Sequence, residues 1–256
     1  MFRVYRAAGG DSPDPAEKAF ASRYVSYLIL KGVSLLQFTT RDPDVYVSAL
    51  TEADATTGLF EGHPGGTFSK VFRWSFEKQG LYHPPGGPQL VRSPGDPPEV
   101  DVFIDDGRTS EYMPFQADFA GDAEIWNRNQ SDDGAANQAP VVGVVNFAYV
   151  RVKNRGTTDA TEDIVRGFQS KTAGASVWPT DWKPLTPSQL PAANDVPSGG
   201  EVVVGPFPWT PQFAGETLLF GVSALGDRSN LEIVTTGPVP NARLVRLDNN
   251  TAQRSF

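Results

Sequence analysis

The sequence predicts an α+β protein in which a small N-terminal helical segment is followed by an antiparallel, immunoglobulin-like β-sandwich. Apolar residues recur every three or four positions in the first 82 residues and at every second position after residue 100. Several short apolar runs in the second half are separated by Gly, Pro, Asn and Asp clusters, which is typical of a sandwich. We therefore expect a helical segment over residues 1–82, a Pro/Gly-rich linker and acidic connector with the first strand over 83–139, and the sandwich over 140–256.

Three helices are predicted in the first part. Two begin where a capping side chain precedes a proline of the first turn, at Ser12-Pro13-Asp14-Pro15 and at Asp42-Pro43. The third is entered through His63-Pro64-Gly65-Gly66-Thr67 and ends at Gly80 in the C-cap position. Each carries an apolar stripe at helical spacing, so each is expected to bury one face. The stripe of the first helix comprises Ala16, Phe20, Ala21, Tyr24, Tyr27, Leu28 and Leu35.

Strands are predicted wherever apolar and polar residues alternate. The first is marked by Val100, Val102 and Ile104. The clearest covers residues 144–153, in which Ala148, Val150 and Val152 face the core and the intervening side chains face solvent, before a turn at Asn154-Arg155-Gly156. Further strands are expected over residues 163–169, 201–204, 217–224, 231–235 and 243–247.

Composition and charge exclude several classes of function. The net charge is −8, and residues 99–133 carry ten carboxylates against two arginines, so that this stretch alone accounts for the whole imbalance. Nucleic acid is therefore not expected as a partner, because no stretch gathers enough Lys and Arg to attract phosphates. No apolar run is long enough to span a membrane, and the absence of cysteine excludes disulfides and thiolate chemistry.

The motifs of common enzymes are missing from the sequence. His63 and His83 are too far apart to form an H-E-x-x-H zinc motif, and each most simply lies in a loop beside proline. Gly65 to Lys70 lacks the spacing of a phosphate-binding P-loop, and no serine stands in a G-x-S-x-G elbow. We predict no catalytic and no cofactor-binding residue.

The acidic connector offers one candidate metal site. Loop carboxylates suit Ca²⁺, which takes six to eight oxygen ligands. The spacing does not match an EF-hand loop, and a solvated acidic connector is the alternative. The candidate ligands of a structural Ca²⁺, the one cofactor considered, are Asp105, Asp106, Asp118, Asp122 and Glu124.

Four tryptophans of the second half are candidate ligand-binding residues. Trp126, Trp178, Trp182 and Trp209 stand beside Asn, Pro or Thr, and exposed aromatic side chains of this kind stack on sugars or anchor protein partners. In the alternative, Trp-Pro segments pack over the core and close the ends of a sandwich.

Parts of the second half resemble the CARDB-like sandwich domains of bacterial surface and secreted proteins. The resemblance lies in residues 146–156 (NFAYVRVKNRG), in Trp178-Pro179 with Trp182, in residues 205–211 (GPFPWTP), and in residues 248–250 (DNN) with Gln253-Arg254. It implies a non-catalytic sandwich.

The first half of the chain is similar to the C-terminal helical edge of a zincin-like metallopeptidase domain. This similarity lies in residues 2–6 with 9–12 and in residues 74–82. The H-E-x-x-H motif of that family is absent, so no zinc ligand is carried over to this sequence.

These observations lead to one leading hypothesis of function and two alternatives. The chain is expected to be a non-catalytic binding or scaffolding module that recognises a protein or glycan surface. It could instead be the accessory part of a secreted zinc metallopeptidase whose catalytic residues lie outside this chain, or a structural subunit of an extracellular or particle-like assembly. As part of a larger secreted protein it would be extracellular or at the cell surface; with no signal peptide at Met1, a cytoplasmic location is the alternative. The oligomeric state is left open.

Overall fold

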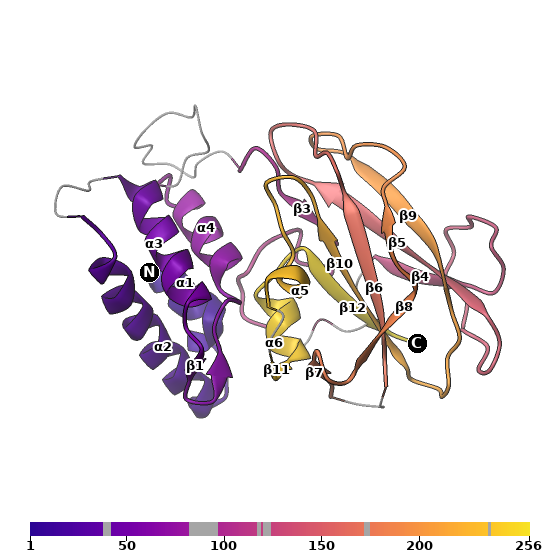
Figure 1. Cartoon of the computed structure of the whole chain (residues 1–256), viewed down its shortest axis with the longest axis horizontal. Coiled ribbons are helices and arrows are strands. Elements are labelled where there is room, and N and C mark those ends of the chain that lie inside the picture. The colour runs from indigo at the N-terminus through magenta and orange to yellow at the C-terminus, as the bar shows by residue number, and fades with distance from the viewer. Residues whose placement is uncertain (38–41, 82–96, 117–118, 120–123, 172–174, 235–236) are drawn as a thin grey trace. The chain divides into compact units, whose positions relative to one another are not determined.

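The computed structural model of this chain divides into two compact units (Figure 1). It describes residues 1–37, 42–81, 97–116, 119, 124–171, 175–234 and 237–256. The first, which we call the helical unit, comprises Met1–Pro98, Glu111–Ala117 and Arg246–Asp248. The second, the sandwich unit, comprises Glu99–Ser110, Asp118–Val245 and Asn249–Phe256. The α+β class predicted from the sequence is confirmed.

The helical unit contains the three predicted helices and a short turn of helix before them. Asp14 and Asp42 each cap the following helix, because their carboxylates accept hydrogen bonds from the backbone N–H groups of Ala16 (2.9 Å) and Asp44 (3.0 Å). None of the described helices is long and apolar enough to cross a membrane. The elements are α1 (Phe2–Tyr5), η1 (Arg6–Gly10), α2 (Pro15–Ser34), α3 (Pro43–Ala55), β1 (Leu59–Phe60), β2 (His63–Pro64) and α4 (Ser69–Glu77).

The core of the helical unit is aromatic and is organised around one buried carboxylate. Asp54 of α3 accepts a hydrogen bond from the Tyr24 hydroxyl (2.5 Å) and another from the backbone N–H of Phe68 (2.8 Å), the residue that precedes α4. Burial raises the pKa of Asp54, although the hydrogen bond from Tyr24 acts in the opposite direction. One side chain thus joins α2, α3 and the start of α4.

α4 ends at Glu77 with Lys78 in the C-cap position, so the predicted C-cap Gly80 lies two residues further on, in the turn that closes the helix. The φ of Gly80 is +64°, a left-handed conformation that favours glycine, and it allows the N–H of Leu81 to return to the carbonyl of Phe76 (2.9 Å). Of the predicted linker at residues 83–98, residues 83–96 lie outside the described part of the chain.

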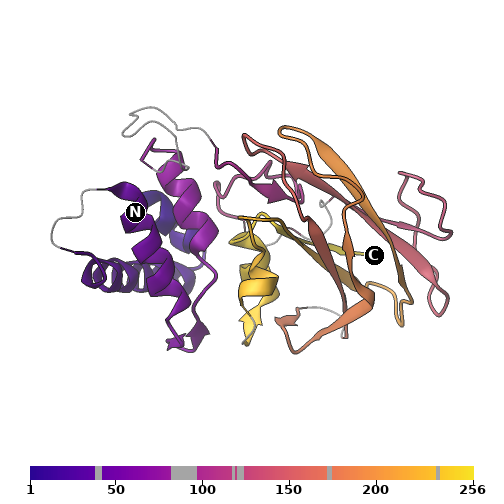
Figure 2. The same cartoon turned by 45° about the horizontal axis from the view of Figure 1, so that its top comes forward.

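The sandwich unit contains two four-stranded antiparallel sheets that face each other (Figures 1 and 2), and a two-stranded antiparallel sheet formed by β7 and β11. One sheet has the strand order β12-β10-β6-β8. In the other, β5 pairs with β3 and β4 along one edge and with β9 along the other. The strands are β3 (Val102–Phe103), β4 (Ile125–Arg128), β5 (Asn146–Asn154), β6 (Ile164–Ser170), β7 (Val177–Trp178), β8 (Trp182–Pro191), β9 (Glu201–Trp209), β10 (Thr217–Ser223), β11 (Val239–Pro240) and β12 (Thr251–Ser255).

The alternation predicted for the central strand is largely borne out in β5. Ala148, Val150 and Val152 are fully buried in the core between the sheets. Tyr149 faces the opposite way but is also buried, because the ring of Trp126 stacks on it at 5.7 Å. The strand begins at Asn146, so the predicted positions 144 and 145 precede it.

The sandwich begins earlier in the chain than the sequence predicts. Strands β3 and β4 both pair with β5, although they fall within the residues expected to form a connector. Residues 246–248 group with the helical unit, where Leu247 is buried among its apolar side chains. The sequence placed the start of the sandwich at residue 140, whereas the sandwich unit of the structure begins at Glu99. Local composition does not reveal which strands pair, and that pairing is what assigns β3 and β4 to the sandwich.

Two predicted strands near the C-terminus are wrong. Residues 231–233 lie in α5 (Asn230–Ile233), and residues 243–246 lie in α6 (Asn241–Arg246). Both helices pack with β7 and β11 on the outer face of the β10 sheet, where Leu219, Leu231 and Leu244 form a second apolar cluster. Short apolar runs fit either kind of element, and burial against that outer face decides for helices.

We expect Tyr24→Phe to lower the free energy of unfolding by about 1–3 kcal/mol, because it removes the hydroxyl donor from the buried Asp54 carboxylate. Denaturation in urea, followed by circular dichroism, measures the change. Tyr46→Phe is the matched control, since the Tyr46 hydroxyl makes no hydrogen bond to the described residues and its loss should change stability by less than about 0.5 kcal/mol. Equal effects of the two substitutions would contradict the role assigned to Asp54.

A second prediction concerns pH and the sandwich unit. Burial, aided by the nearby Asp195 carboxylate, raises the pKa of Asp163 to about 6 from an unperturbed 3.8. The folded state therefore holds a proton more tightly than the unfolded state, and the stability this contributes below pH 3.8 is lost as the pH rises through about 6. Between pH 4 and pH 7, the free energy of unfolding of the wild type, measured by urea denaturation, should fall by roughly 1–3 kcal/mol relative to that of the Asp163→Asn variant. Parallel stability curves for the two proteins would refute the assignment.

Candidate binding site

All four tryptophans that the sequence marked as candidates are buried. Trp126, Trp178, Trp182 and Trp209 are 7%, 5%, 4% and 3% exposed. Three of them donate their indole N–H within the protein: Trp126 to the carbonyl of Gly134 (2.8 Å), Trp178 to that of Val234 (2.6 Å) and Trp209 to the side-chain oxygen of Asn127 (2.9 Å). The structure thus favours the packing alternative, since a buried ring offers no open face to a sugar.

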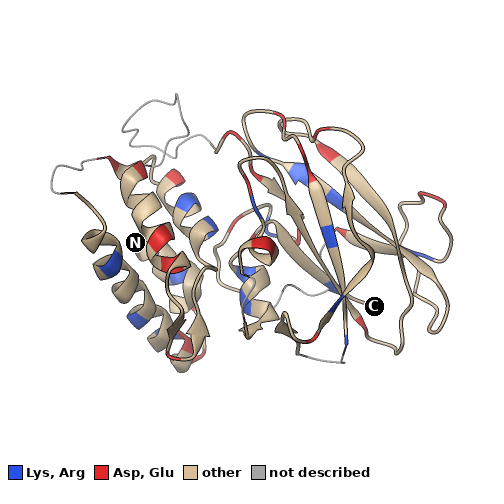
Figure 3. Ribbon diagram, viewed as in Figure 1, with Lys and Arg blue, Asp and Glu red and all other residues tan. Residues whose placement is uncertain are grey.

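The acidic connector is paired with basic side chains of β5. Lys153 binds both Asp105 (2.9 Å) and Glu124 (2.6 Å), and Arg151 also reaches Glu124 (3.1 Å). Burial alone would raise the pKa of Asp105, but the hydrogen bond from Lys153 holds it below its usual value. Figure 3 shows acidic and basic residues interspersed along the strands and helices.

The remaining predicted calcium ligands do not add to a described site. Asp106 is buried and forms an ion pair with Arg108 (2.6 Å), and Asp118 and Asp122 lie outside the described residues. Across the described parts of the chain, no three His, Asp or Glu side chains gather in a way that could hold a metal ion. A structural Ca²⁺ therefore stays a prediction that rests on the sequence alone.

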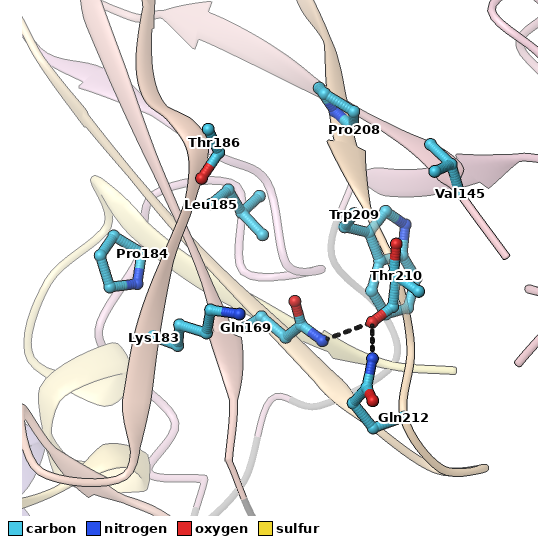
Figure 4. A pocket seen from close by; sticks show the side chains of 10 residues that line it. All are labelled: Val145, Gln169, Lys183, Pro184, Leu185, Thr186, Pro208, Trp209, Thr210 and Gln212. Atoms are coloured by element: carbon cyan, nitrogen blue, oxygen red, sulfur yellow. Dashed lines mark hydrogen bonds between the residues drawn. The ribbon is translucent and has the colours of Figure 1, made fainter. Parts of the chain in front are cut away.

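A pocket of about 270 Å³ opens between the two sheets, where their edge strands β8 and β9 meet (Figure 4). Its apolar walls come from Leu185 and Pro184 of β8, Pro208 and Trp209 of β9, and Val145. Its polar lining consists of Gln169, Lys183, Thr186, Thr210 and Gln212. Half of the lining residues are thus polar, so a ligand that carries both polar and apolar groups would find partners for each.

The orientation of Gln169 in this pocket is fixed by a buried carboxylate. Its side-chain N–H₂ donates to the carbonyl of Thr210 (2.9 Å) and to Glu216, which is 1% exposed. The second carboxylate oxygen of Glu216 accepts from the backbone N–H of Gln212 (2.7 Å). Because both donors of the amide are held, its oxygen must turn toward the space bounded by Leu185 and Trp209, as Figure 4 shows.

Lys183 stands directly opposite Gln169 in the pairing of β8 with β6, so that the two side chains share one face of the sheet. That face is the inner one, on which Leu185 reaches the core. Lys183 makes no ion pair with the described residues. An inward-pointing lysine on an edge strand also protects a sheet from edge-to-edge aggregation, and the prolines of β8 act in the same way.

An exposed apolar turn borders the pocket. Val141, Val142, Val144 and Val145 are 48%, 49%, 50% and 53% exposed, and we call them the valine turn. Gly143 lies at its centre with a φ of +80°, and its N–H bonds to the carbonyl of Pro211 (2.9 Å). Val145 is also a wall of the pocket, so the turn and the pocket form one continuous surface.

The valine turn is held by the fully buried Asn146. The Asn146 amide N–H₂ donates to the carbonyls of Val141 (3.0 Å) and Val144 (2.8 Å), and its oxygen accepts from the N–H of Val141 (3.0 Å) and from Asn127 (3.3 Å). The same Asn127 receives the indole N–H of Trp209. One amide network thus positions both the turn and a wall of the pocket.

Of this site, sequence reasoning named Trp209 and missed the other residues. After Pro140, two pairs of valines flank Gly143, and paired valines do not alternate with polar residues as the following strand does. This pattern could have indicated an exposed turn. Nothing local marks Gln169 or Lys183, because strand pairing brings them together.

Comparison with known proteins adds two similar structures. No protein-family model matches the sequence, and no curated protein matches it. A crystal structure of a CARDB domain from Pyrococcus furiosus in complex with di-metal ions is 16% identical over 61% of this chain and 84% of that one, with a TM-score of 0.30. The solution NMR structure of that domain is 16% identical over 52% of this chain and 87% of that one, with a TM-score of 0.26. The strands and their pairing, and not these low scores, establish the sandwich.

We expect Asn146→Ala to lower the free energy of unfolding by about 2–4 kcal/mol, because it leaves the backbone groups of Val141 and Val144 without partners. Amide hydrogen exchange at Val141 should become faster at the same time. Asn129→Ala is the control: its exposed side chain accepts a single bond from Asn127, and its removal should leave exchange at Val141 unchanged. Unaltered exchange in the Asn146 variant would show that the turn does not depend on this side chain.

Proposed function

We propose that the sandwich unit is a non-catalytic recognition module whose pocket between β8 and β9 receives a polar group of a protein partner. The observation that carries the proposal is the fixed orientation of Gln169. The Thr210 carbonyl and the buried Glu216 carboxylate accept from the two amide donors, which leaves the amide oxygen as one acceptor directed into a pocket of mixed apolar and polar lining. Such preorganisation favours binding, because little conformational freedom is left to lose.

The chemistry of the pocket supports binding over catalysis. Its lining contains no histidine and no carboxylate. The Glu216 carboxylate that binds Gln169 is buried, and both of its oxygens already accept hydrogen bonds, from Gln169 and Gln212. The pocket residues therefore do not provide a general base beside a nucleophile.

A protein partner fits the site better than a glycan does. Sugar-binding surfaces use exposed aromatic faces, whereas Trp209 is 3% exposed and anchored from behind by Asn127. The partner is not expected to add a strand, because Pro184, Pro187 and Pro191 of β8 lack the N–H that a sheet ladder needs. Recognition through side chains that enter the pocket is the remaining mode.

The wider roles expected from the sequence are compatible with this module and stay proposals. It could serve as the accessory part of a secreted zinc metallopeptidase, or within an extracellular or particle-like assembly. In either role the pocket would contact another polypeptide.

Selection of displayed random peptides on the whole chain tests the proposal. We expect the enriched peptides to lose at least about tenfold in affinity, or about 1.4 kcal/mol, with Lys183→Glu, since the substitution replaces an attraction at the pocket by a repulsion. Lys18→Glu, an equal change of charge on the exposed face of α2, should leave their affinity unchanged. Enriched peptides that bind the Lys183 variant as well as they bind the wild type, and that also leave the NMR signal of the Gln169 side-chain amide unshifted, would refute the pocket as the site.

A further inference from the structure

We infer that the pocket and the valine turn together bind a peptide segment that carries a carboxylate next to a bulky apolar side chain. This inference rests on the proposed function and names the chemistry of its ligand.

The charge of the site calls for an anionic group. Lys183 lines the pocket at its solvent-exposed side and makes no ion pair with the described residues, whereas Lys153, Arg151 and Arg108 of the same unit are each paired with carboxylates. Lys171 and Arg254 make no ion pair with the described residues either, but each donates to a backbone carbonyl. A carboxylate of the ligand would give Lys183 the partner that those cations have. The hydroxyl of Thr186 on the same strand can donate a second hydrogen bond.

The Gln169 oxygen requires a donor beside that carboxylate. It accepts no hydrogen bond from the described residues, and it is held in place opposite Lys183. A carboxylate alone would leave this acceptor unsatisfied, whereas a peptide provides a backbone N–H close to its acidic side chain. A free inorganic anion has no such donor, so the pair of Lys183 and Gln169 favours a peptide.

The valine turn supplies the apolar half of the site. The four valine side chains are about half exposed, while hydrogen bonds from Asn146 fix the backbone of the turn. Contact with an apolar side chain of a partner would remove this apolar surface from water, which favours binding. Val145 belongs to both the turn and the pocket, which places the two subsites next to each other. At about 270 Å³ the pocket is slightly smaller than most ligand sites, so it suits a single side chain.

Three capped tetrapeptide probes test this inference on the whole chain: acetyl-Gly-Glu-Leu-Gly-amide, the same peptide with Gln in place of Glu, and the same peptide with Ser in place of Leu. Titration is followed in ¹⁵N-resolved NMR spectra, through the side-chain amide of Gln169 and the backbone amides of the valine turn. We expect the Glu-Leu probe to bind at least fivefold more tightly than either of the others.

Variants of the two subsites give separate results. Lys183→Gln should remove the preference for Glu over Gln, and Lys183→Arg should keep it. Val142→Ser with Val144→Ser should remove the preference for Leu over Ser. Lys18→Gln and Val203→Ser are the matched controls, and both should preserve all preferences; Val203 is 48% exposed, like the valines of the turn.

Each contrary outcome has a distinct meaning. Equal binding of the Glu and Gln probes, or a preference that survives Lys183→Gln, would overturn the inference. Displayed peptides that use the pocket but lack acidic residues would overturn it too, while the proposed function would stand. Failure of any displayed peptide to engage the pocket would count against both. Light scattering that showed a dimer dissociated by the valine substitutions would make a second copy of the chain the occupant, and would likewise overturn the inference.

Discussion

Strand β5 depends on two buried asparagines, one at each end, and much of the sandwich depends on β5. Where a strand ends, backbone N–H and C=O groups lose their ladder partners and must find others, because an unpaired buried group costs free energy. Asn146 supplies those partners at the start of the strand. Asn154 does so at its end: its amide donates to the carbonyls of Thr158 (2.9 Å) and Val196 (3.1 Å), and its oxygen accepts from the N–H of Gly156 (2.8 Å).

One side of the candidate site is positioned from this strand and its neighbours, whereas Gln169 and Lys183 come from β6 and β8 of the facing sheet. Because β5 pairs with β9 along one edge, Asn146 lies opposite Trp209, and the end of β9 is brought to the mouth of the pocket. Asn127 of β4 joins the same network and fixes the Trp209 ring. The pocket therefore combines rigid walls with one directed acceptor, which is the arrangement that preorganised binding requires.

The outward face of β5 also explains why carboxylates of the acidic connector are paired with basic side chains. Arg151 and Lys153 point away from the core and meet Asp105 and Glu124, so carboxylates that look free in the sequence are paired in the fold. A cluster of acidic residues along a chain predicts a cation site only if nothing basic folds back onto it. Here a strand that follows the connector supplies the cations, which leaves Lys183 as the pocket cation for a ligand to pair with.

The sequence by itself determined the features that depend on local chemistry. The starts of α2 and α3 were predictable because Asp14 and Asp42 cap the next turn, and the end of α4 because Gly80 adopts a positive φ. The core face of β5 followed from its alternation. Only the tertiary structure decided that residues 231–233 and 243–246 are helical, since short apolar runs suit either element until a sheet face covers them. The same holds for the site: Gln169, Lys183 and the valine turn are separated along the chain, and strand pairing across the two sheets is what brings their charges, donors and apolar surfaces together.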